Sequence, residues 1–388
     1  MNRLKNKEKY DIAVVIPTYN EMSCIGNTVK KIDEGLARYY PDYRPLIINA
    51  DSDSGDGTKE IFISTKSKSK KIFISGGKNP RGKGKNIFSA IKLSLKLGVR
   101  YIAMFDADIS TIGEKWVKLM IDPVINDRAD FVTPIYTRNR YEGNTTNHFC
   151  YPLLYAWFGK SLAQPIGGDF SMSRKFANHI INKKKPPSAY IYGVDVFLSI
   201  HAVGDGFKLR EIYLGRKIHK PSFEKMIPMF QQVAATLLYL LPGKRRHQKC
   251  ITTAKRIGRI DKFIKKPEES KIIFLKKYAL KKLKKTPLEE IKKIFGINDK
   301  KIIYLLEKKP YLSEDEWIKI LANLIKYIDS NEIDYKNAKK IASLISPFFF
   351  LRVISYFKEV GKNQKYGSSI DIAHRQAKKL KNQQSLSN

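Results

Sequence analysis

The segment Phe105-Asp106-Ala107-Asp108 carries the pair of side chains in this sequence best suited to chemistry. Side chains two positions apart on an extended segment point the same way, so Asp106 and Asp108 can face one site. Two hard oxygen ligands at a strand end suit Mg²⁺ or Mn²⁺, which keep further coordination positions for water and substrate phosphates. Because Asp-x-Asp is a common sequence, the functional reading depends on the segments around it.

A glycine-rich basic segment, Gly76-Gly77-Lys78-Asn79-Pro80-Arg81-Gly82-Lys83-Gly84-Lys85, precedes a predicted helix. Residues 77–83 have the spacing of a phosphate-binding P-loop. Gly84, however, stands where that motif needs a Ser or Thr hydroxyl for Mg²⁺, which disfavours an NTPase. Lys83 remains well placed to neutralise a diphosphate near a helix N-terminus.

Polar residues follow each of the first two predicted strands. The first strand and its exit read Val14-Val15-Ile16-Pro17-Thr18-Tyr19-Asn20-Glu21. The exit opens a helix whose N-terminal amides, with Glu21, suit a nucleotide base or ribose. The second, Asn49–Thr58, places Asp51 toward the same ligand. It is not an EF-hand loop, because Asp56 and Phe62 replace the Gly and Glu that such a loop requires. Helix capping before Thr58 accounts for some of its polar residues.

The elements that position these residues are short apolar runs alternating with amphipathic stretches. Strands are expected over 11–17, 45–50, 71–75, 101–105 and 130–133, and helices over 23–36, 58–65, 86–97 and 114–121. This order predicts an α/β fold with a Rossmann-like, mostly parallel central sheet. Ligands of such sheets bind at the carboxyl ends of the strands, where every polar cluster above lies.

The rest of the chain changes character in two steps. Residues 136–243 mix polar loops with helices expected over 194–203 and 229–241, and Pro242-Gly243 breaks the pattern. Beyond it the chain reads as helical, and the aromatic run 347–351 is typical of a buried helix face. We therefore expect a catalytic domain over 1–243 and a basic, all-helical domain over 244–388.

Composition narrows the class of protein. The 388 residues include 73 Lys and Arg against 37 Asp and Glu, a formal charge of +36, and 43% are hydrophobic. Three distant cysteines exclude a disulfide scaffold or a Cys-rich zinc module. The N-terminus has no apolar core of a signal peptide, and no apolar run approaches about 20 residues, so we expect a soluble, cytoplasmic protein. The lysine-rich stretch 276–285 suits nucleic acid or lipid headgroups, but a solvated helix face is the simpler interpretation.

Taken together, the V-V-I-P-T-Y-N-E opening, the D-S-D-S-G-D-G-T turn and the D-A-D segment resemble nucleotide-sugar glycosyltransferases of the GT-A fold. Four later motifs narrow the resemblance, over about residues 11–240, to the family of mannosylglycerate synthase and glucosyl-3-phosphoglycerate synthase: Gly82-Lys83-Gly84, Gln164-Pro165-Ile166-Gly167-Gly168, Tyr192-Gly193-Val194-Asp195 and Gly215-Arg216-Lys217-Ile218-His219. The resemblance implies a metal-dependent transfer of a hexose from a UDP- or GDP-sugar to D-glycerate or 3-phosphoglycerate.

The resemblance also implies roles for particular residues on the donor side. Contacts to the nucleotide-sugar are expected from Pro17, Tyr19, Glu21, Asp51, Lys83, Asp106, Ala107 and Asp108. Mg²⁺ or Mn²⁺ is expected on Asp106, Asp108 and His219, with Asp108 the more direct ligand. Arg216 and Lys217, just before His219, would repel an uncompensated cation, so the role of His219 rests on the resemblance.

On the sugar and acceptor side, Gln164, Gly167 and Gly168 are expected in a loop beneath the sugar, with their glycines allowing close backbone approach. Catalytic roles fall to Asp195, Lys83 and Ile166. The acceptor is expected to bind the following residues: Arg138, Arg140, Thr145, Thr146 and Lys220.

The relatives transfer sugar with retention, and a same-face displacement fits this chain because no carboxylate must act as a nucleophile. In this hypothesis the metal and Lys83 stabilise the departing nucleotide, while Asp195 orients sugar and acceptor. Asp195 acting as a base on the opposite face would instead give inversion.

Two alternatives stay open: a polyprenyl-phosphate or polysaccharide hexosyltransferase of the same fold and, remotely, a basic nucleic-acid-binding protein. The expected partners are small molecules and no nucleic acid, with membrane contact through the basic C-terminal region and a homodimer as further options.

Overall fold

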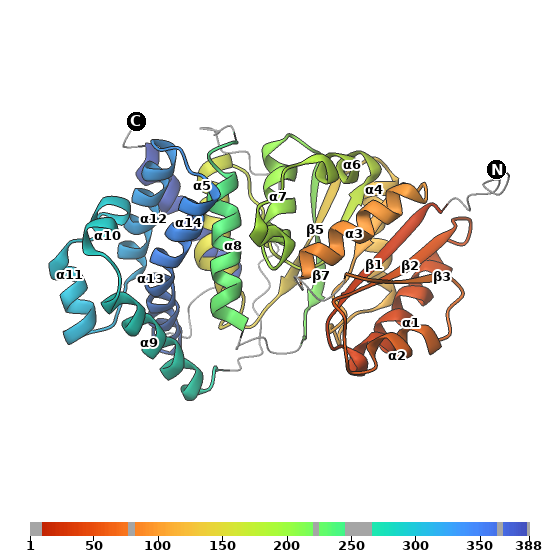
Figure 1. The fold of residues 1–388 in the computed structure, drawn as a ribbon, viewed down its shortest axis with the longest axis horizontal. Helices are drawn as coiled ribbons and strands as arrows, with labels where there is room; N and C mark the ends of the chain where they lie inside the picture. The colour runs from red at the N-terminus through yellow and green to blue at the C-terminus, as the bar shows by residue number, and fades with distance from the viewer. Residues whose placement is uncertain (1–9, 77–81, 220–224, 245–265, 363–367, 386–388) are drawn as a thin grey trace. The chain divides into compact units, whose positions relative to one another are not determined.

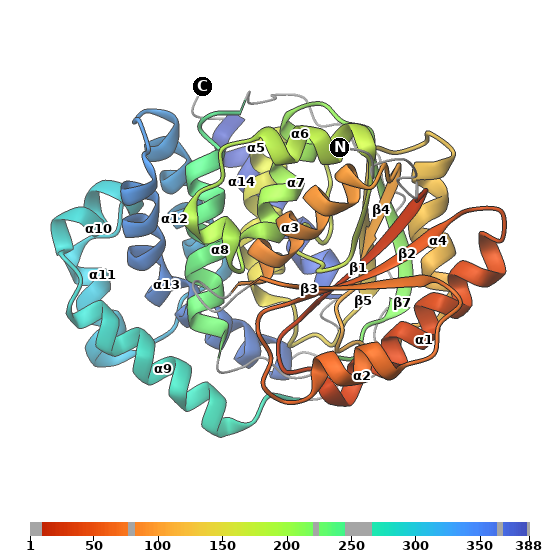
Figure 2. The same ribbon diagram turned by 45° about the vertical axis from the view of Figure 1, so that its right-hand side comes forward.

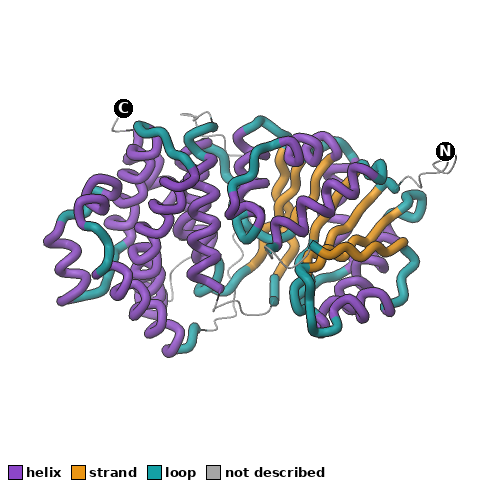
Figure 3. The backbone as a smooth tube through the Cα atoms, viewed as in Figure 1, coloured by secondary structure: helices purple, strands orange, loops and turns teal. Residues whose placement is uncertain are grey.

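The computed structural model describes residues 10–76, 82–219, 225–244, 266–362 and 368–385. The chain forms two compact units, of which the first comprises residues 1–136 and 166–221 and the second comprises 137–165 and 222–388. Except for the last residue of one strand, the strands belong to the first unit, and the second is helical (Figures 1 and 3).

The first unit is built on a seven-stranded sheet of order β3-β2-β1-β4-β6-β5-β7. Its strands are β1 (Ile12–Thr18), β2 (Pro45–Asp51), β3 (Lys70–Ser75), β4 (Tyr101–Met104), β5 (Phe131–Thr137), β6 (Phe170–Ser173) and β7 (Leu209–Arg216). β1 pairs in parallel with β2 and β4, and β2 with β3, whereas β6 runs antiparallel between β4 and β5. The predicted mostly parallel sheet is confirmed, and the antiparallel β6 was not foreseen.

Helices cover both faces of this sheet (Figure 2). Those of the first unit are α1 (Met22–Tyr39), α2 (Thr58–Ser64), α3 (Lys83–Lys96), α4 (Glu114–Ile125), α6 (Arg174–Asn182) and α7 (Val194–Gly204), with a 3₁₀ turn η2 (Pro187–Tyr190). α1 packs with α2 and α4, and α3 packs with α6 and α7. The strands and helices expected in residues 11–133 all form, within a few residues of the predicted ends.

The core of the first unit explains why β1 is apolar along its whole length. Ile12, Val14 and Ile16 point to one face and pack with α1, whose buried positions 25, 29, 32 and 36 recur at helical spacing. Ala13 and Val15, on the other face, are equally buried. A parallel strand covered on both faces needs a continuous apolar run, and this buried strand holds the site residues at its carboxyl end.

The second unit consists of helices from two separate parts of the chain. They are η1 (Thr146–Cys150), α5 (Tyr151–Phe158), α8 (Met226–Leu240), α9 (Glu269–Lys284), α10 (Leu288–Phe295), α11 (Asp299–Ile303), η4 (Tyr304–Lys308), α12 (Glu314–Asp329), α13 (Tyr335–Lys362) and α14 (Ser369–Ser385). α13 packs against α8 and α9, and α14 against α5. The domain boundary expected at residue 243 lies inside this unit, and the division into domains over 1–243 and 244–388 stays a prediction.

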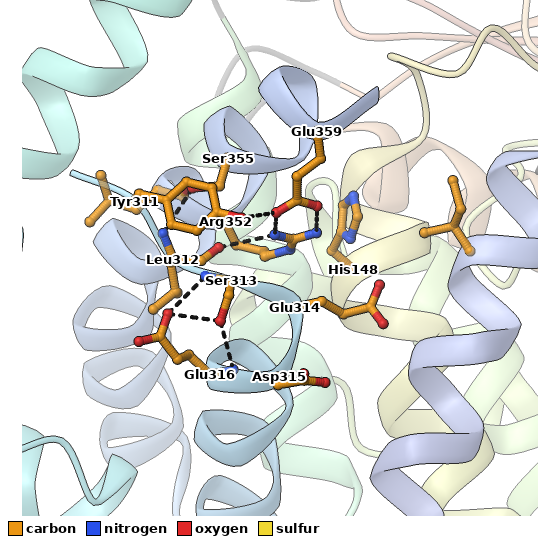
Figure 4. A network of polar contacts seen from close by, with 12 residues as sticks. His148, Tyr311, Leu312, Ser313, Glu314, Asp315, Glu316, Arg352, Ser355 and Glu359 are labelled. Atoms are coloured by element: carbon orange, nitrogen blue, oxygen red, sulfur yellow. Dashed lines mark hydrogen bonds and ion pairs between the residues drawn. The ribbon is translucent and has the colours of Figure 1, made fainter. Parts of the chain in front are cut away.

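A buried ion pair within α13 lies beside the chain that enters α12 (Figure 4). The fully buried Arg352 guanidinium donates to both carboxylate oxygens of Glu359, at 2.6 and 2.7 Å, and to the carbonyl of Leu312 at 3.0 Å. Tyr311 donates to the same carboxylate at 2.8 Å. The bidentate pair sets the directions of both side chains, and their bonds to Leu312 and Tyr311 hold the chain entering α12 against α13.

By length and composition, one helix among the described residues would be able to cross a membrane. The helix is α13, and 89% of its most apolar stretch is buried inside the protein. Phe348, Phe349 and Phe350 within it are fully covered, as expected for the aromatic run. Because neighbouring helices bury it, α13 is the core helix of the second unit. It is longer than any apolar segment that we expected from the sequence.

Candidate active site

The carboxyl ends of β1 and β2 meet at Thr18 and Asp51, which are paired residues of the parallel ladder. Thr18 Oγ1 donates to Asp51 Oδ1 at 2.6 Å, and the amide and hydroxyl of Ser54 donate to the same carboxylate at 2.6 and 2.7 Å. Asp51 is 1% exposed. Its carboxylate therefore organises the turn after β2 in this structure, while its expected contact with a base or ribose stays a prediction.

The exits of β1 and β2 are joined by side-chain caps. The amide of Glu21 donates to Thr58 Oγ1 at 2.8 Å, and that of Met22 to Asp56 Oδ2 at 3.1 Å. These bonds fasten the start of α1 to the start of α2. Tyr19, 39% exposed, lies in the exit of β1, which is where a nucleoside contact is expected. The capping residues of these turns therefore hold in place the segments that are expected to contact the nucleotide-sugar.

Lys83 brings together two carboxylates from distant parts of the chain. Its ammonium group lies 2.7 Å from Asp106 Oδ1, at the end of β4, and 3.6 Å from Asp195 Oδ1, on the first turn of α7. All three side chains are mostly buried. The structure therefore unites three of the predicted site residues at the carboxyl edge of the sheet.

Close backbone packing explains how Lys83 reaches Asp195. The amide of Gly84 donates to the carbonyl of Ile191 at 3.0 Å, and a Cβ added to Gly84 would lie 1.9 Å from the Ala189 carbonyl oxygen. Only glycine allows the first turn of α3 to touch the segment that leads into α7. The Gly-Lys-Gly motif is thus needed for packing as well as for its charge.

Sequence reasoning missed a second lysine, Lys217, on the other side of Asp106. Its ammonium group lies 3.1 Å from Asp106 Oδ2 and 2.9 Å from Asp169 Oδ2, and it donates to the carbonyl of Gly167 at 2.9 Å. Asp169 also accepts the Asp106 amide at 2.7 Å and the hydroxyl of Tyr136. The expectation that this basic segment repels a cation is wrong for Lys217, because two carboxylates neutralise it.

The sequence contains only a weak signal for the roles of Asp169 and Lys217. Asp169 directly follows the predicted Gly167-Gly168 loop, and Lys217 lies two positions before His219. Nothing local shows that residues 48 positions apart form a pair. Gly168 has φ of +93°, and a Cβ there would lie 2.2 Å from Asp106 Oδ2. The loop glycine therefore allows close approach to the Asp106 carboxylate.

Opposing charges set the ionisation of this cluster. Burial alone would raise the pKa of Asp106, but the ammonium groups of Lys83 and Lys217 hold it well below its usual range. Burial would lower the pKa of Lys83, and the carboxylates of Asp106 and Asp195 raise it instead. Burial raises the pKa of Asp169 and of Asp195. Three carboxylates facing two ammonium groups favour a further cation nearby.

Asp108 and His219 are the pair that fits a divalent metal. His219 Nδ1 lies 4.0 Å from Asp108 Oδ2, and both side chains are partly exposed. The backbone brings them together, because the amide of Ser110 donates to the carbonyl of Ile218 at 2.9 Å. Both oxygens of Asp106 contact lysine ammonium groups, so its expected metal contact requires one lysine to move. A carboxylate and an imidazole are suitable Mn²⁺ or Mg²⁺ ligands.

The remaining predicted residues are divided between the two units. Pro17, Ala107 and Ile166 belong to the first unit, as do Lys83 and Asp106. Four expected acceptor residues and the first residue of the expected sugar loop belong to the second unit: Arg138, Arg140, Thr145, Thr146 and Gln164. Lys220 lies outside the described residues. Within the second unit, Arg138 Nε donates to Gln164 Oε1 at 3.2 Å, so the start of the expected sugar loop touches one expected acceptor residue.

Comparisons with known proteins agree with this architecture. Residues 13–180 match the family model described as glycosyl transferase family 2. Glucosyl-3-phosphoglycerate synthase of Petrotoga mobilis is 25% identical over 211 residues, which cover 50% of this chain and 61% of that protein. This chain therefore spans less than two thirds of the length of the curated relative.

Similar solved structures include glucosyl-3-phosphoglycerate synthase from Mycobacterium tuberculosis in complex with Mn²⁺, UDP and phosphoglyceric acid (23% identity, 59% of this chain and 78% of that one, TM-score 0.48). Another is mannosyl-3-phosphoglycerate synthase from Rubrobacter xylanophilus (20% identity, 59% and 72%, TM-score 0.48). The match of residues 13–180 to the glycosyl transferase family 2 model and the mostly parallel sheet confirm the GT-A resemblance read from the motifs.

Proposed function

We propose that this protein is a metal-dependent hexosyltransferase that uses a nucleotide-sugar donor, UDP- or GDP-linked, and glycosylates D-glycerate or 3-phosphoglycerate. The observation that carries the proposal is the convergence of Lys83, Asp106 and Asp195 beside Asp108 and His219, within a family 2 domain. The name of the Petrotoga relative, a glucosyl-3-phosphoglycerate synthase, is the reason to place 3-phosphoglycerate among the first acceptors tested.

Asp108 and His219 would hold the metal, with Asp106 joining if a lysine moves. A bound Mg²⁺ or Mn²⁺ supplies positive charge that stabilises a departing nucleoside diphosphate. Lys83 adds a second positive charge from the N-terminus of α3. The expected nucleoside contacts of Pro17, Tyr19, Glu21 and Asp51 belong to the same proposal.

Asp195 is suited to orient a hydroxyl group. Its Oδ1 is buried and accepts no hydrogen bond from the described residues, although Lys83 lies 3.6 Å away. A buried acceptor of this kind is costly unless it is satisfied, and a sugar or acceptor hydroxyl would satisfy it. We propose a same-face displacement in which the departing diphosphate takes the acceptor proton and the product retains the anomeric configuration. The anomeric coupling constant of the product distinguishes this route from inversion.

A specific observation keeps a lipid-linked acceptor as the second candidate. On α9, Ile273 and Phe274 are 44% and 51% exposed, and the exposed Lys276 and Lys277 follow after the buried Leu275. Exposed apolar groups beside lysines suit an anionic membrane surface. In the glycerate proposal the enzyme is cytoplasmic, and membrane contact or a homodimer through the helical region stays a prediction.

The test is donor-dependent nucleotide release. Purified protein with Mg²⁺ or Mn²⁺ is incubated with UDP- and GDP-hexoses, each with D-glycerate, 3-phosphoglycerate or a polyprenyl phosphate. Release that requires one donor and one glycerate acceptor, and that is lost in Asp108→Ala, supports the proposal. The control is Asp42→Ala, which removes an exposed carboxylate from the turn before β2, at the opposite edge of the sheet. Turnover with only the lipid acceptor would contradict the glycerate assignment.

A further inference from the structure

Two histidines and an aspartate converge where the ends of α6 and α7 meet. His179 is in the last turn of α6, His201 is in the last turn of α7, and Asp205 directly follows α7. His179 Nε2 lies 2.6 Å from Asp205 Oδ2, and His201 Nδ1 lies 2.9 Å from the same oxygen. The proposed transfer uses none of these residues.

The three groups match the requirements of a zinc site. Their ligand atoms all lie within 4.8 Å of one another. Tetrahedral Zn²⁺ with ligands at about 2.0–2.2 Å keeps its ligand atoms roughly 3.3 Å apart. Small rotations of the two imidazoles would lengthen the present nitrogen–oxygen separations to that spacing. Two nitrogens and one carboxylate oxygen form a common zinc ligand set, with water as the fourth ligand.

Burial and charge at the cluster are compatible with a bound cation. The side chain of His201 is 5% exposed and that of Asp205 is 16% exposed, whereas His179 is 27% exposed and leaves a path to solvent. Lys183 is a competing cation, with its ammonium 3.6 Å from Asp205 Oδ2. That side chain is 37% exposed, so it can turn into water when a metal binds.

We propose that His179, His201 and Asp205 form a Zn²⁺ site separate from the one at Asp108 and His219. Asp195 is in the first turn of α7 and His201 is in its last turn, and the ten-residue step along the helix separates Asp195 from Asp205 by about 15 Å. Two imidazoles with one carboxylate favour Zn²⁺, whereas the Asp108 site offers a single imidazole, that of His219, and suits a harder ion such as Mn²⁺. The metal would join α6 to α7 and so hold the helix that carries Asp195. This proposal does not depend on the transferase activity.

The test measures zinc stoichiometry in the full chain after treatment with a chelator. In the Asp108→Ala/His219→Ala background, which removes the other site, titration with Zn²⁺ is expected to give one bound equivalent, and Co²⁺ a tetrahedral visible spectrum. Adding His179→Ala should weaken binding at least 100-fold. Adding Lys183→Ala should strengthen it, because the competing ammonium is gone.

Absence of a stoichiometric Zn²⁺ equivalent in the double-variant background would overturn the proposal, and so would unchanged affinity after His179→Ala. Circular dichroism checks the fold of each variant. If His179→Ala does not fold, His179→Gln replaces it, since glutamine keeps a hydrogen-bond donor toward Asp205 and removes the imidazole ligand. If neither His179 variant folds, the zinc affinity of Lys183→Ala is compared with that of its parent. Equal affinities would place the ion away from Asp205 and would overturn the proposal.

Discussion

The ammonium group of Lys83 lies 2.7 Å from Asp106 Oδ1, so the helix after β3 is tied to the end of β4. Lys217 contacts the other oxygen of the same carboxylate at 3.1 Å. Asp106 therefore pairs with two lysine ammonium groups, whereas Asp108, two residues later, faces His219. Because the two carboxylates have different contacts, substitutions of Asp106 and of Asp108 should have different effects.

Replacing Lys83 should reduce turnover more than binding. Lys83→Ala removes the cation expected beside the departing diphosphate, and loss of one such group costs about 100-fold or more in kcat. Steady-state kinetics with the donor and acceptor that the nucleotide-release assay selects measure the effect. Lys92→Ala, on the exposed side of the same helix, is the matched control and should behave as the parent protein. An unchanged kcat in Lys83→Ala would remove this residue from the mechanism.

Replacing Lys217 should destabilise the protein. Lys217→Met leaves Asp169, which is fully buried, without its ammonium partner, and breaking such a pair costs about 3–5 kcal/mol. Burial already raises the pKa of Asp169, and losing the lysine raises it further. Protonation of Asp169 removes the uncompensated charge, so the stability deficit should shrink as the pH falls.

Denaturant unfolding at several pH values measures this effect. Arg210→Met, an exposed substitution on β7, the strand that leads into Lys217, is the control. A deficit in Lys217→Met that is independent of pH would contradict the assignment of the buried charge to Asp169.

Enlarging Gly84 should misplace Lys83 without removing its charge. In Gly84→Ala the new methyl would lie 1.9 Å from the Ala189 carbonyl oxygen, so the start of α3 must move. A displacement of about 1 Å in a catalytic group costs on the order of 100-fold in rate. We expect that loss in kcat/KM. Gly113→Ala, where the added atom has no neighbour within 4 Å, should be active, and equal activity of the two variants would refute the packing argument.

His148 should make the second unit sensitive to acid. Burial, assisted by the nearby charge of Arg352, lowers the pKa of His148 to about 3 from an ordinary value of 6.5. The unfolded chain therefore binds a proton that the folded chain excludes as the pH falls below 6.5. The free energy of unfolding should drop by up to about 1.4 kcal/mol per pH unit between 6.5 and 3 from this residue.

His148→Gln, which cannot titrate, should have a shallower loss of stability over that pH range. His374→Gln, a second buried histidine of the same unit, is the control for the loss of an imidazole. Parallel stability curves for His148→Gln and the parent protein would contradict this account.

The sequence by itself determined the parallel half of the sheet and the polar groups at its carboxyl edge. Buried parallel strands such as β1 must be apolar throughout, and this local pattern is visible without a structure. The turn after each strand needs particular residues, so Asp51, Lys83, Asp106 and Asp108 can be found from their positions alone.

The tertiary structure decided what local patterns cannot encode. β6 has four residues, and β7 is a partly exposed strand of mixed polarity, so neither has an apolar run to detect. The pairing of Lys217 with Asp169 and the convergence of His179 on Asp205 join residues 48 and 26 positions apart. Residues 137–165 likewise leave the sheet to pack with helices far along the chain. Contacts of this kind depend on the three-dimensional path of the backbone, because the interacting groups share no local period or spacing.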